Sequence, residues 1–174
     1  IVVEGCSAGG HLAASLGVFW DEDFLAESQG LSASEHELLR PDGLLLCYPV
    51  ITSGEFAHRG SFENLLGSRQ EELGEKLSLE KQVTNKVPKT FIWHTFADQS
   101  VPVENSLLFV SALRRAGVPT EFHMYEKGAH GLALADKLTE NFFKTEADIR
   151  PLFESQLEDC GVDYFDFYLM HSQC

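Results

Sequence analysis

The chain has 174 residues, of which 44% are hydrophobic, and its formal net charge at pH 7 is −14. This length and apolar content suit one globular domain with a hydrophobic core, and they exclude a wholly disordered chain. The acidic balance argues against nucleic acid and anionic membrane surfaces as partners, and no apolar run reaches the ~18 residues of a membrane span.

The four cysteines, Cys6, Cys47, Cys160 and Cys174, show neither zinc-ligand spacing nor the density of a small secreted scaffold. We interpret them as free thiols, with Cys6 as a packing residue, and we predict no metal and no cofactor. Free thiols and the lack of a signal-peptide pattern favour a cytoplasmic location. The sequence opens inside an expected strand and without an initiator methionine, which favours an N-terminal truncation.

The first stretch of the chain combines a strand, a tight turn and a helix. Residues 1–3 are apolar, residues 13–18 have the pattern of a packed helix, and Gly5-Cys6-Ser7-Ala8-Gly9 between them has nucleophile-elbow spacing. Ser7 is therefore the candidate nucleophile. It is expected at a helix N-terminus, where the Ala8 N–H can stabilise an oxyanion. The alternative is an ordinary Gly/Ser loop, because this pentapeptide also occurs by chance.

An acidic loop is expected over residues 21–41, with a short helix over residues 34–39. The spacing of Ser34 and Glu37 predicts a capping box for this helix. Residues 43–49 then form a continuous apolar run, which is typical of a strand that is buried on both faces of a parallel sheet.

The segment that follows, residues 51–89, has the pattern of an insertion with charged helices over residues 61–66 and 70–77. Insertions of this kind can form part of a substrate-binding wall. His58 and Arg59 could face a substrate there, although an exposed pair of loop residues is the simpler interpretation.

A second strand–helix–strand unit follows. Residues 90–94 and 120–125 are expected to be strands, and residues 105–116 are expected to form the helix between them, with Pro102 in its first turn and Gly117 at its end. Strands that alternate with helices predict an α/β fold with a parallel sheet and flanking helices.

Ser7, Asp98 and His130 each come directly after an expected strand, and catalytic groups in such folds lie at the carboxyl ends of the strands. A serine, an acid and a histidine in this chain order are typical of acyl transfer by a catalytic triad. Two alternatives remain open. Asp98 could simply cap the following helix without a catalytic role. Glu104 is a second candidate for the acid, although we expect it to lie on that helix. His94 is interpreted as a core histidine.

Several separate motifs carry a resemblance over residues 1–136. The chain resembles α/β-hydrolase esterases related to acetyl esterases and xylan esterases in GCSAGGH at 5–11, HRGS at 58–61, ENLLG at 63–67, FADQSVPVENS at 96–106 and EKGAHG at 126–131. The resemblance implies that Ser7, Asp98 and His130 form the triad. It also implies short-chain esters as substrates, with acetyl groups on plant polysaccharide or its oligomers as one class. The family's second oxyanion donor comes from a His-Gly-Gly loop on an earlier strand, and no such loop precedes Ser7.

The C-terminal 35 or so residues have a different resemblance. Residues 141–157 and 160–171 are similar to one helix and one barrel strand of aldo-keto reductases, with His171 at the position of a catalytic histidine. One such unit cannot form a barrel, so we predict no reductase activity. The predicted organisation is a partial hydrolase portion over residues 1–138 and a foreign helix–strand tail over residues 139–174.

The sequence therefore predicts a serine hydrolase for short-chain carboxylic esters, with a small ester or an acetylated carbohydrate as substrate. The alternative is a truncated or chimeric fragment without catalytic activity. The sequence leaves the oligomeric state open.

Overall fold

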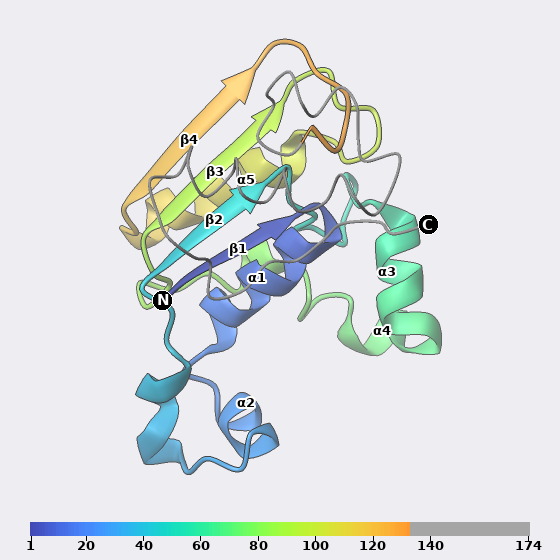
Figure 1. Cartoon of the computed structure of the whole chain (residues 1–174). Helices are drawn as coiled ribbons and strands as arrows, with labels where there is room; N and C mark the ends of the chain where they lie inside the picture. The colour runs from blue at the N-terminus through green and yellow to red at the C-terminus, as the bar shows by residue number, and fades with distance from the viewer. Residues whose placement is uncertain (133–174) are drawn as a thin grey trace, which may run out of the picture.

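The computed structural model describes residues 1–132, so the tail predicted over residues 139–174 lies outside the described residues. Within residues 1–132, four strands form one parallel sheet in the order β1-β2-β3-β4 (Figure 1). The strands are β1 (Val2–Cys6), β2 (Gly43–Cys47), β3 (Thr90–Thr95) and β4 (Thr120–Tyr125). All four lie where strands were predicted from the sequence, although β1 extends to Cys6, beyond the apolar residues 1–3.

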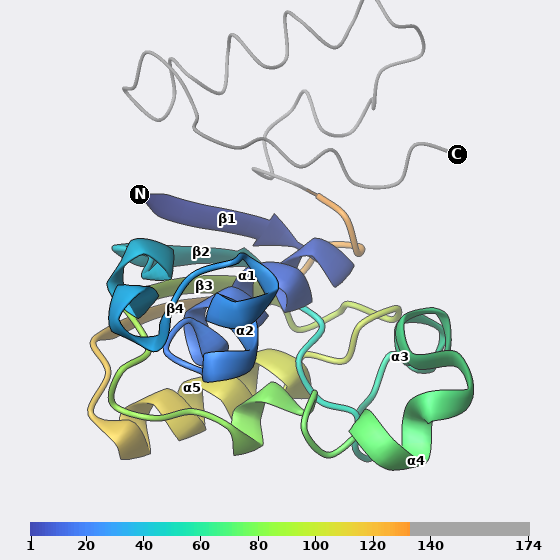
Figure 2. The same cartoon turned by 90° about the horizontal axis from the view of Figure 1, so that it is seen from below.

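Helices connect the strands as the alternating pattern predicted. The described helices are α1 (Ala8–Phe19), α2 (Asp23–Ser28), α3 (Arg59–Leu66), α4 (Gln70–Leu73) and α5 (Glu104–Ala116), with 3-10 helices η1 (Ala33–Leu39), η2 (Gly67–Arg69) and η3 (Leu79–Lys81). Figure 2 shows that α1 and α5 lie on the same face of the sheet. Among these helices, none is long and apolar enough to cross a membrane.

The main core lies between the sheet and the α1–α5 layer. Its fully buried members include Ala14 of α1, Leu46 of β2, Ile92 of β3 and Phe109 and Leu113 of α5. Because the strands are parallel, all their carboxyl ends meet at one edge of the sheet. The loops after β1, β3 and β4 therefore leave the sheet at this edge.

The acidic segment between α1 and β2 is more ordered than expected. It contains α2, which the sequence analysis missed, and η1 begins earlier than the predicted capping box of Ser34 and Glu37 allows. The box is formed instead by Ser32 and Glu35: the Ser32 N–H and hydroxyl both donate to Glu35 Oε2, at 2.9 and 2.6 Å. Both serine–glutamate pairs have the right spacing, and the earlier helix start selects the first pair.

The helix predicted over residues 70–77 is shorter than expected, since α4 ends at Leu73. Gly74 follows directly, and a glycine in a helix interior costs about 1 kcal/mol relative to alanine. The helix predicted over residues 105–116 is confirmed as α5, which ends at Ala116 and is capped by Gly117 in the left-handed conformation with φ 75°.

Gly5→Ala should destabilise the fold. A Cβ at this position would lie 2.2 Å from the Gly9 carbonyl oxygen and 2.8 Å from the Ala13 Cβ, and the backbone of the turn cannot easily move away. We expect a loss of about 1–3 kcal/mol in the free energy of unfolding, measured by urea denaturation. Gly60→Ala in α3 is the control, because its new Cβ would meet nothing closer than 3.8 Å. This variant should be as stable as the parent or slightly more so; equal stability of both variants would contradict the steric argument.

Candidate active site

Ser7 lies in a strained turn between β1 and α1. Its φ of 54° and ψ of −121° are rarely adopted by a residue with a side chain, and such strain costs on the order of 1–3 kcal/mol. Hydrogen bonds hold the turn: the Ser7 N–H donates to the Cys47 carbonyl at 3.0 Å, and the Ser7 carbonyl accepts from the N–H groups of Gly10 and Val50, both at 3.0 Å. The turn thus projects the Ser7 hydroxyl from the carboxyl edge of the sheet.

His130 contacts this hydroxyl from the loop after β4. Its Nε2 lies 2.7 Å from Ser7 Oγ. The His130 ring also packs edge-on against the Tyr48 ring, with 4.9 Å between ring centroids. The loop is tied to β3 because the Thr95 hydroxyl donates to the Gly128 carbonyl at 2.9 Å. These contacts place an imidazole directly over the candidate nucleophile.

Asp98 completes a line of hydrogen bonds from the loop after β3. Its Oδ2 lies 2.6 Å from His130 Nδ1, and its Oδ1 accepts from the N–H groups of Ser100 and Val101 at 2.9 and 3.0 Å. A carboxylate beside Nδ1 favours a proton on that nitrogen, which leaves Nε2 free to accept the Ser7 proton. These bonded N–H groups precede α5, so Asp98 does not cap that helix.

The charged form of Asp98 is strongly favoured. Burial by itself raises the pKa of this carboxyl, but hydrogen bonds from His130, His94, Val101 and Ser100 outweigh burial and hold the pKa well below its usual value. Asp98 is therefore an anion at neutral pH, as the orientation of a neighbouring imidazolium requires.

His94 is a fully buried core histidine, as the sequence predicted, but it also contacts the acid. Its Nε2 lies 3.0 Å from the Val101 carbonyl oxygen and 3.2 Å from Asp98 Oδ2. Both of these oxygens are acceptors, so Nε2 carries a proton, and Nδ1 forms a hydrogen bond of 2.8 Å with the Ser106 hydroxyl. This second imidazole partner of Asp98 was not predicted from the sequence. The only sequence signal for this contact was that His94 ends an expected strand and Asp98 follows shortly after it.

Ala8 is the first residue of α1, where backbone N–H groups have no intrahelical acceptor. A cavity of about 460 Å³ begins beside it and extends between α1 and α3, with His11, Leu12, Ser61, Phe62 and Asn64 among its lining residues. His11 is buried there, where its Nε2 donates to the Leu77 carbonyl at 2.9 Å, and burial lowers the pKa of its imidazole. His58 and Arg59 lie at the start of α3. Arg59 is exposed, whereas His58 is half-buried and pairs with Ser61.

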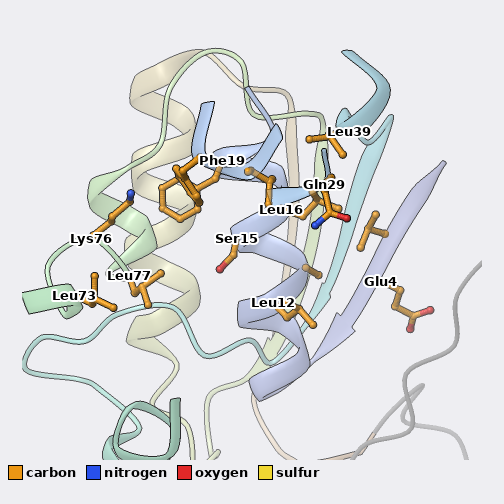
Figure 3. A pocket seen from close by; sticks show the side chains of 14 residues that line it. Glu4, Leu12, Ser15, Leu16, Phe19, Gln29, Leu39, Leu73, Lys76 and Leu77 are labelled. Atoms are coloured by element: carbon orange, nitrogen blue, oxygen red, sulfur yellow. The ribbon is translucent and has the colours of Figure 1, made fainter. Parts of the chain in front are cut away.

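A larger cavity, of about 710 Å³, lies along α1 and β1 (Figure 3) and shares Leu12, Ser15 and Leu77 with the smaller one. Its lining is mostly apolar and includes Leu12, Leu16, Phe19 and Leu77. None of Ser7, Asp98 and His130 lines it. They do not line the smaller cavity either, but that cavity reaches Ala8, the residue directly after Ser7.

Comparison with known sequences assigns this chain to a family. Residues 48–148 match the sequence profile of the prolyl oligopeptidase family, which is more than half of the chain. The chain belongs to the prolyl oligopeptidase family. Solved structures of hydrolases share its fold, which confirms the partial α/β-hydrolase fold predicted from the sequence.

Two curated relatives are similar to this chain in sequence. An endo-1,4-beta-xylanase B from Butyrivibrio fibrisolvens is 44% identical over 140 residues, covering 78% of this chain and 21% of that protein. An acetylxylan esterase from Xylanibacter ruminicola is 30% identical over 135 residues, covering 74% of this chain and 25% of that protein. The chain thus spans about a fifth to a quarter of the curated relatives that it matches.

The solved structures cover more of the chain. An acetyl ester-xyloside bifunctional hydrolase from Caldicellulosiruptor lactoaceticus is 41% identical with a TM-score of 0.64, covering 91% of this chain and 56% of that one. A carboxylesterase from Lactobacillus plantarum is 29% identical with a TM-score of 0.64, covering 92% of this chain and 58% of that one. The relatives are therefore esterases and related carbohydrate-active hydrolases.

The depressed pKa of Asp98 predicts a pH-dependent contribution to stability. Because the folded-state pKa lies below the unfolded value of about 3.9, this contribution is complete above that value and is lost as the pH falls below it. Asp98→Asn removes the titrating group. The difference in free energy of unfolding between parent and variant should therefore shrink as the pH falls from about 5 to about 2. Urea denaturation at each pH measures it, and a difference that is independent of pH would contradict the assignment.

Proposed function

We propose that this family member is a serine hydrolase that cleaves short-chain, acetyl-type carboxylic esters with Ser7, His130 and Asp98. The observation that supports this most is the pair of hydrogen bonds in series, 2.7 Å from Ser7 Oγ to His130 Nε2 and 2.6 Å from His130 Nδ1 to Asp98 Oδ2. A nucleophile, a base and an orienting acid joined in this order are what acyl transfer requires.

In the first half of the reaction, Ser7 Oγ attacks the ester carbonyl carbon while His130 Nε2 takes the hydroxyl proton. The negative charge that develops on the carbonyl oxygen is stabilised by the Ala8 N–H and the N-terminal end of α1. When the intermediate collapses, His130 returns the proton to the leaving alkoxide and an acyl-serine remains. Asp98 holds the imidazole in its orientation and stabilises the imidazolium.

In the second half, water attacks the acyl-serine carbonyl and His130 takes a proton from that water. The tetrahedral intermediate then collapses to a carboxylic acid, and His130 returns the proton to Ser7 Oγ. No cofactor enters either half.

An acetylated carbohydrate is the substrate class that the relatives favour. Their names include an acetylxylan esterase and an acetyl ester-xyloside bifunctional hydrolase. The cavity of about 460 Å³ beside Ala8 is within the usual range for small-molecule sites. Polar groups from His11, Ser61 and Asn64 line it among apolar ones, a combination that suits a sugar ester.

Peptide hydrolysis is the second candidate, because the family takes its name from an oligopeptidase. The same three side chains can attack an amide, but an amide is less reactive than an ester.

The alternative of an inactive fragment rests on the oxyanion site. Only the Ala8 N–H is assigned to it, and loss of one oxyanion donor typically lowers the rate about 100- to 1000-fold.

Ser7→Ala should abolish hydrolysis of p-nitrophenyl acetate and labelling by a serine-reactive fluorophosphonate, because it removes the hydroxyl that lies 2.7 Å from His130 Nε2. Stopped assays of p-nitrophenol release and mass spectrometry of the labelled protein measure the two effects. Ser28→Ala, at an exposed serine of α2, is the matched control and should keep both signals. Equal signals in Ser7→Ala and the parent would rule out Ser7. No signal in the folded parent would support the inactive fragment.

Acetyl release from acetylated xylo-oligosaccharides should exceed cleavage of a proline p-nitroanilide by at least about 100-fold in kcat/KM if the ester assignment is right. We expect this because an ester carbonyl is more electrophilic than an amide carbonyl and an alkoxide is a better leaving group than an amide nitrogen, and because the polar cavity beside Ala8 can accept the sugar. Acetate release and p-nitroaniline absorbance measure the two rates. A preference for the anilide would favour the peptidase instead.

A further inference from the structure

Three metal-ligating side chains converge next to the Ser7 turn without belonging to the proposed triad. Cys6 of β1 lies opposite Cys47 of β2 in the register of the parallel pair, and Glu4 lies two residues before Cys6 and therefore on the same face of the sheet. One carboxylate oxygen of Glu4 and the two sulfur atoms all lie within 4.8 Å of one another.

The surroundings of this Glu4–Cys6–Cys47 cluster leave its negative charge without a protein counter-ion. Cys47 is buried, whereas Cys6 and Glu4 are half-buried. Among residues 1–132, no lysine, arginine or histidine forms an ion pair with Glu4. Burial raises the pKa of the Glu4 carboxyl, as is usual for an acid that lacks a cationic partner. A half-buried carboxylate beside two thiols is a donor set that a cation can complete.

We propose that Glu4, Cys6 and Cys47 form a binding site for a divalent cation of the zinc class. Thiolate sulfur with one carboxylate oxygen suits Zn²⁺ rather than Mg²⁺ or Ca²⁺, which prefer oxygen ligands alone. A tetrahedral Zn²⁺ with bonds of about 2.3 Å to sulfur places two sulfurs about 3.8 Å apart. The two sulfur atoms then need to approach one another by no more than about 1 Å, and the carboxylate oxygen needs to approach each sulfur by slightly more. Binding releases the thiol protons to solvent, and water fills the fourth position.

An ion at this site would link β1 to β2 directly beneath the nucleophile turn. Cys6 precedes Ser7 in the chain, and the Cys47 carbonyl accepts the Ser7 N–H at 3.0 Å. Tyr48, which packs against the His130 ring, follows Cys47. The site therefore lies where it can stiffen the strand ends that hold Ser7 and His130. This binding inference does not depend on the proposed esterase activity.

The test uses the full chain with Cys160→Ser and Cys174→Ser as its background, so that Cys6 and Cys47 supply the only thiols. Reduced, metal-free protein is titrated with Cd²⁺, and the ultraviolet thiolate-to-cadmium charge-transfer band is followed, with Zn²⁺ as competitor. We expect one ion per chain. Cys47→Ser should lose about half of the band and on the order of 100-fold in affinity, and Glu4→Gln should lose on the order of 10-fold. Glu71→Gln, at an exposed glutamate of α4, should bind like the background protein.

A second measurement avoids substitutions at Cys6 and Cys47, where a variant could fail to fold. Stoichiometric Zn²⁺ should protect both thiols of the reduced background protein from alkylation, as mapped by peptide mass spectrometry. Absence of the cadmium band, a band unchanged by Cys47→Ser, or equal alkylation with and without Zn²⁺ would each overturn the proposal. A Cys6–Cys47 disulfide in the unreduced protein, with no metal band after reduction, would overturn it in favour of a covalent link between the strands.

Discussion

The backbone turn at Ser7 is the constraint on which the rest of the site depends. A non-glycine residue with φ 54° is stable only where its surroundings hold it. Here the Cys47 carbonyl fixes its N–H, and the N–H groups of Gly10 and Val50 fix its carbonyl. Gly5 allows the chain to turn back closely enough, since a Cβ there would collide with the Gly9 carbonyl. The sheet and α1 thus fix the position of the Ser7 hydroxyl.

A second constraint is the burial of Asp98 with every acceptor site occupied. A buried carboxylate is tolerated when donors surround it, and Asp98 receives them from two backbone N–H groups and two imidazoles. This arrangement fixes the direction of the His130 ring, because its Nδ1 must face the acid. His94 also contacts the acid, and its own ring is held by hydrogen bonds with the Ser106 hydroxyl and the Val101 carbonyl. Residues of the core therefore hold His94, His94 contacts Asp98, and Asp98 in turn orients His130.

The successes and errors of sequence interpretation have separate physical causes. β2 and β3 were recognisable because strands that are covered on both sides need apolar residues at successive positions. The capping box at Ser34 and Glu37 was wrong because an equivalent pair, Ser32 and Glu35, stands two residues earlier. Local spacing could not distinguish the two pairs. The helix predicted over residues 70–77 was too long because α4 ends at Leu73, directly before Gly74, a residue that disfavours helix continuation.

The sequence by itself determined the alternation of strands and helices and the placement of Ser7, Asp98 and His130 after three strands, because those features depend on residues that are close in the chain. The approach of the three side chains to hydrogen-bonding distance was decided by the parallel sheet, which gathers its strand ends at one edge. Only the tertiary structure revealed the contact of His94 with Asp98, the packing of Tyr48 on His130, and the convergence of Glu4, Cys6 and Cys47. The last of these arises from strand register, and register is set by the packing of whole elements rather than by local spacing.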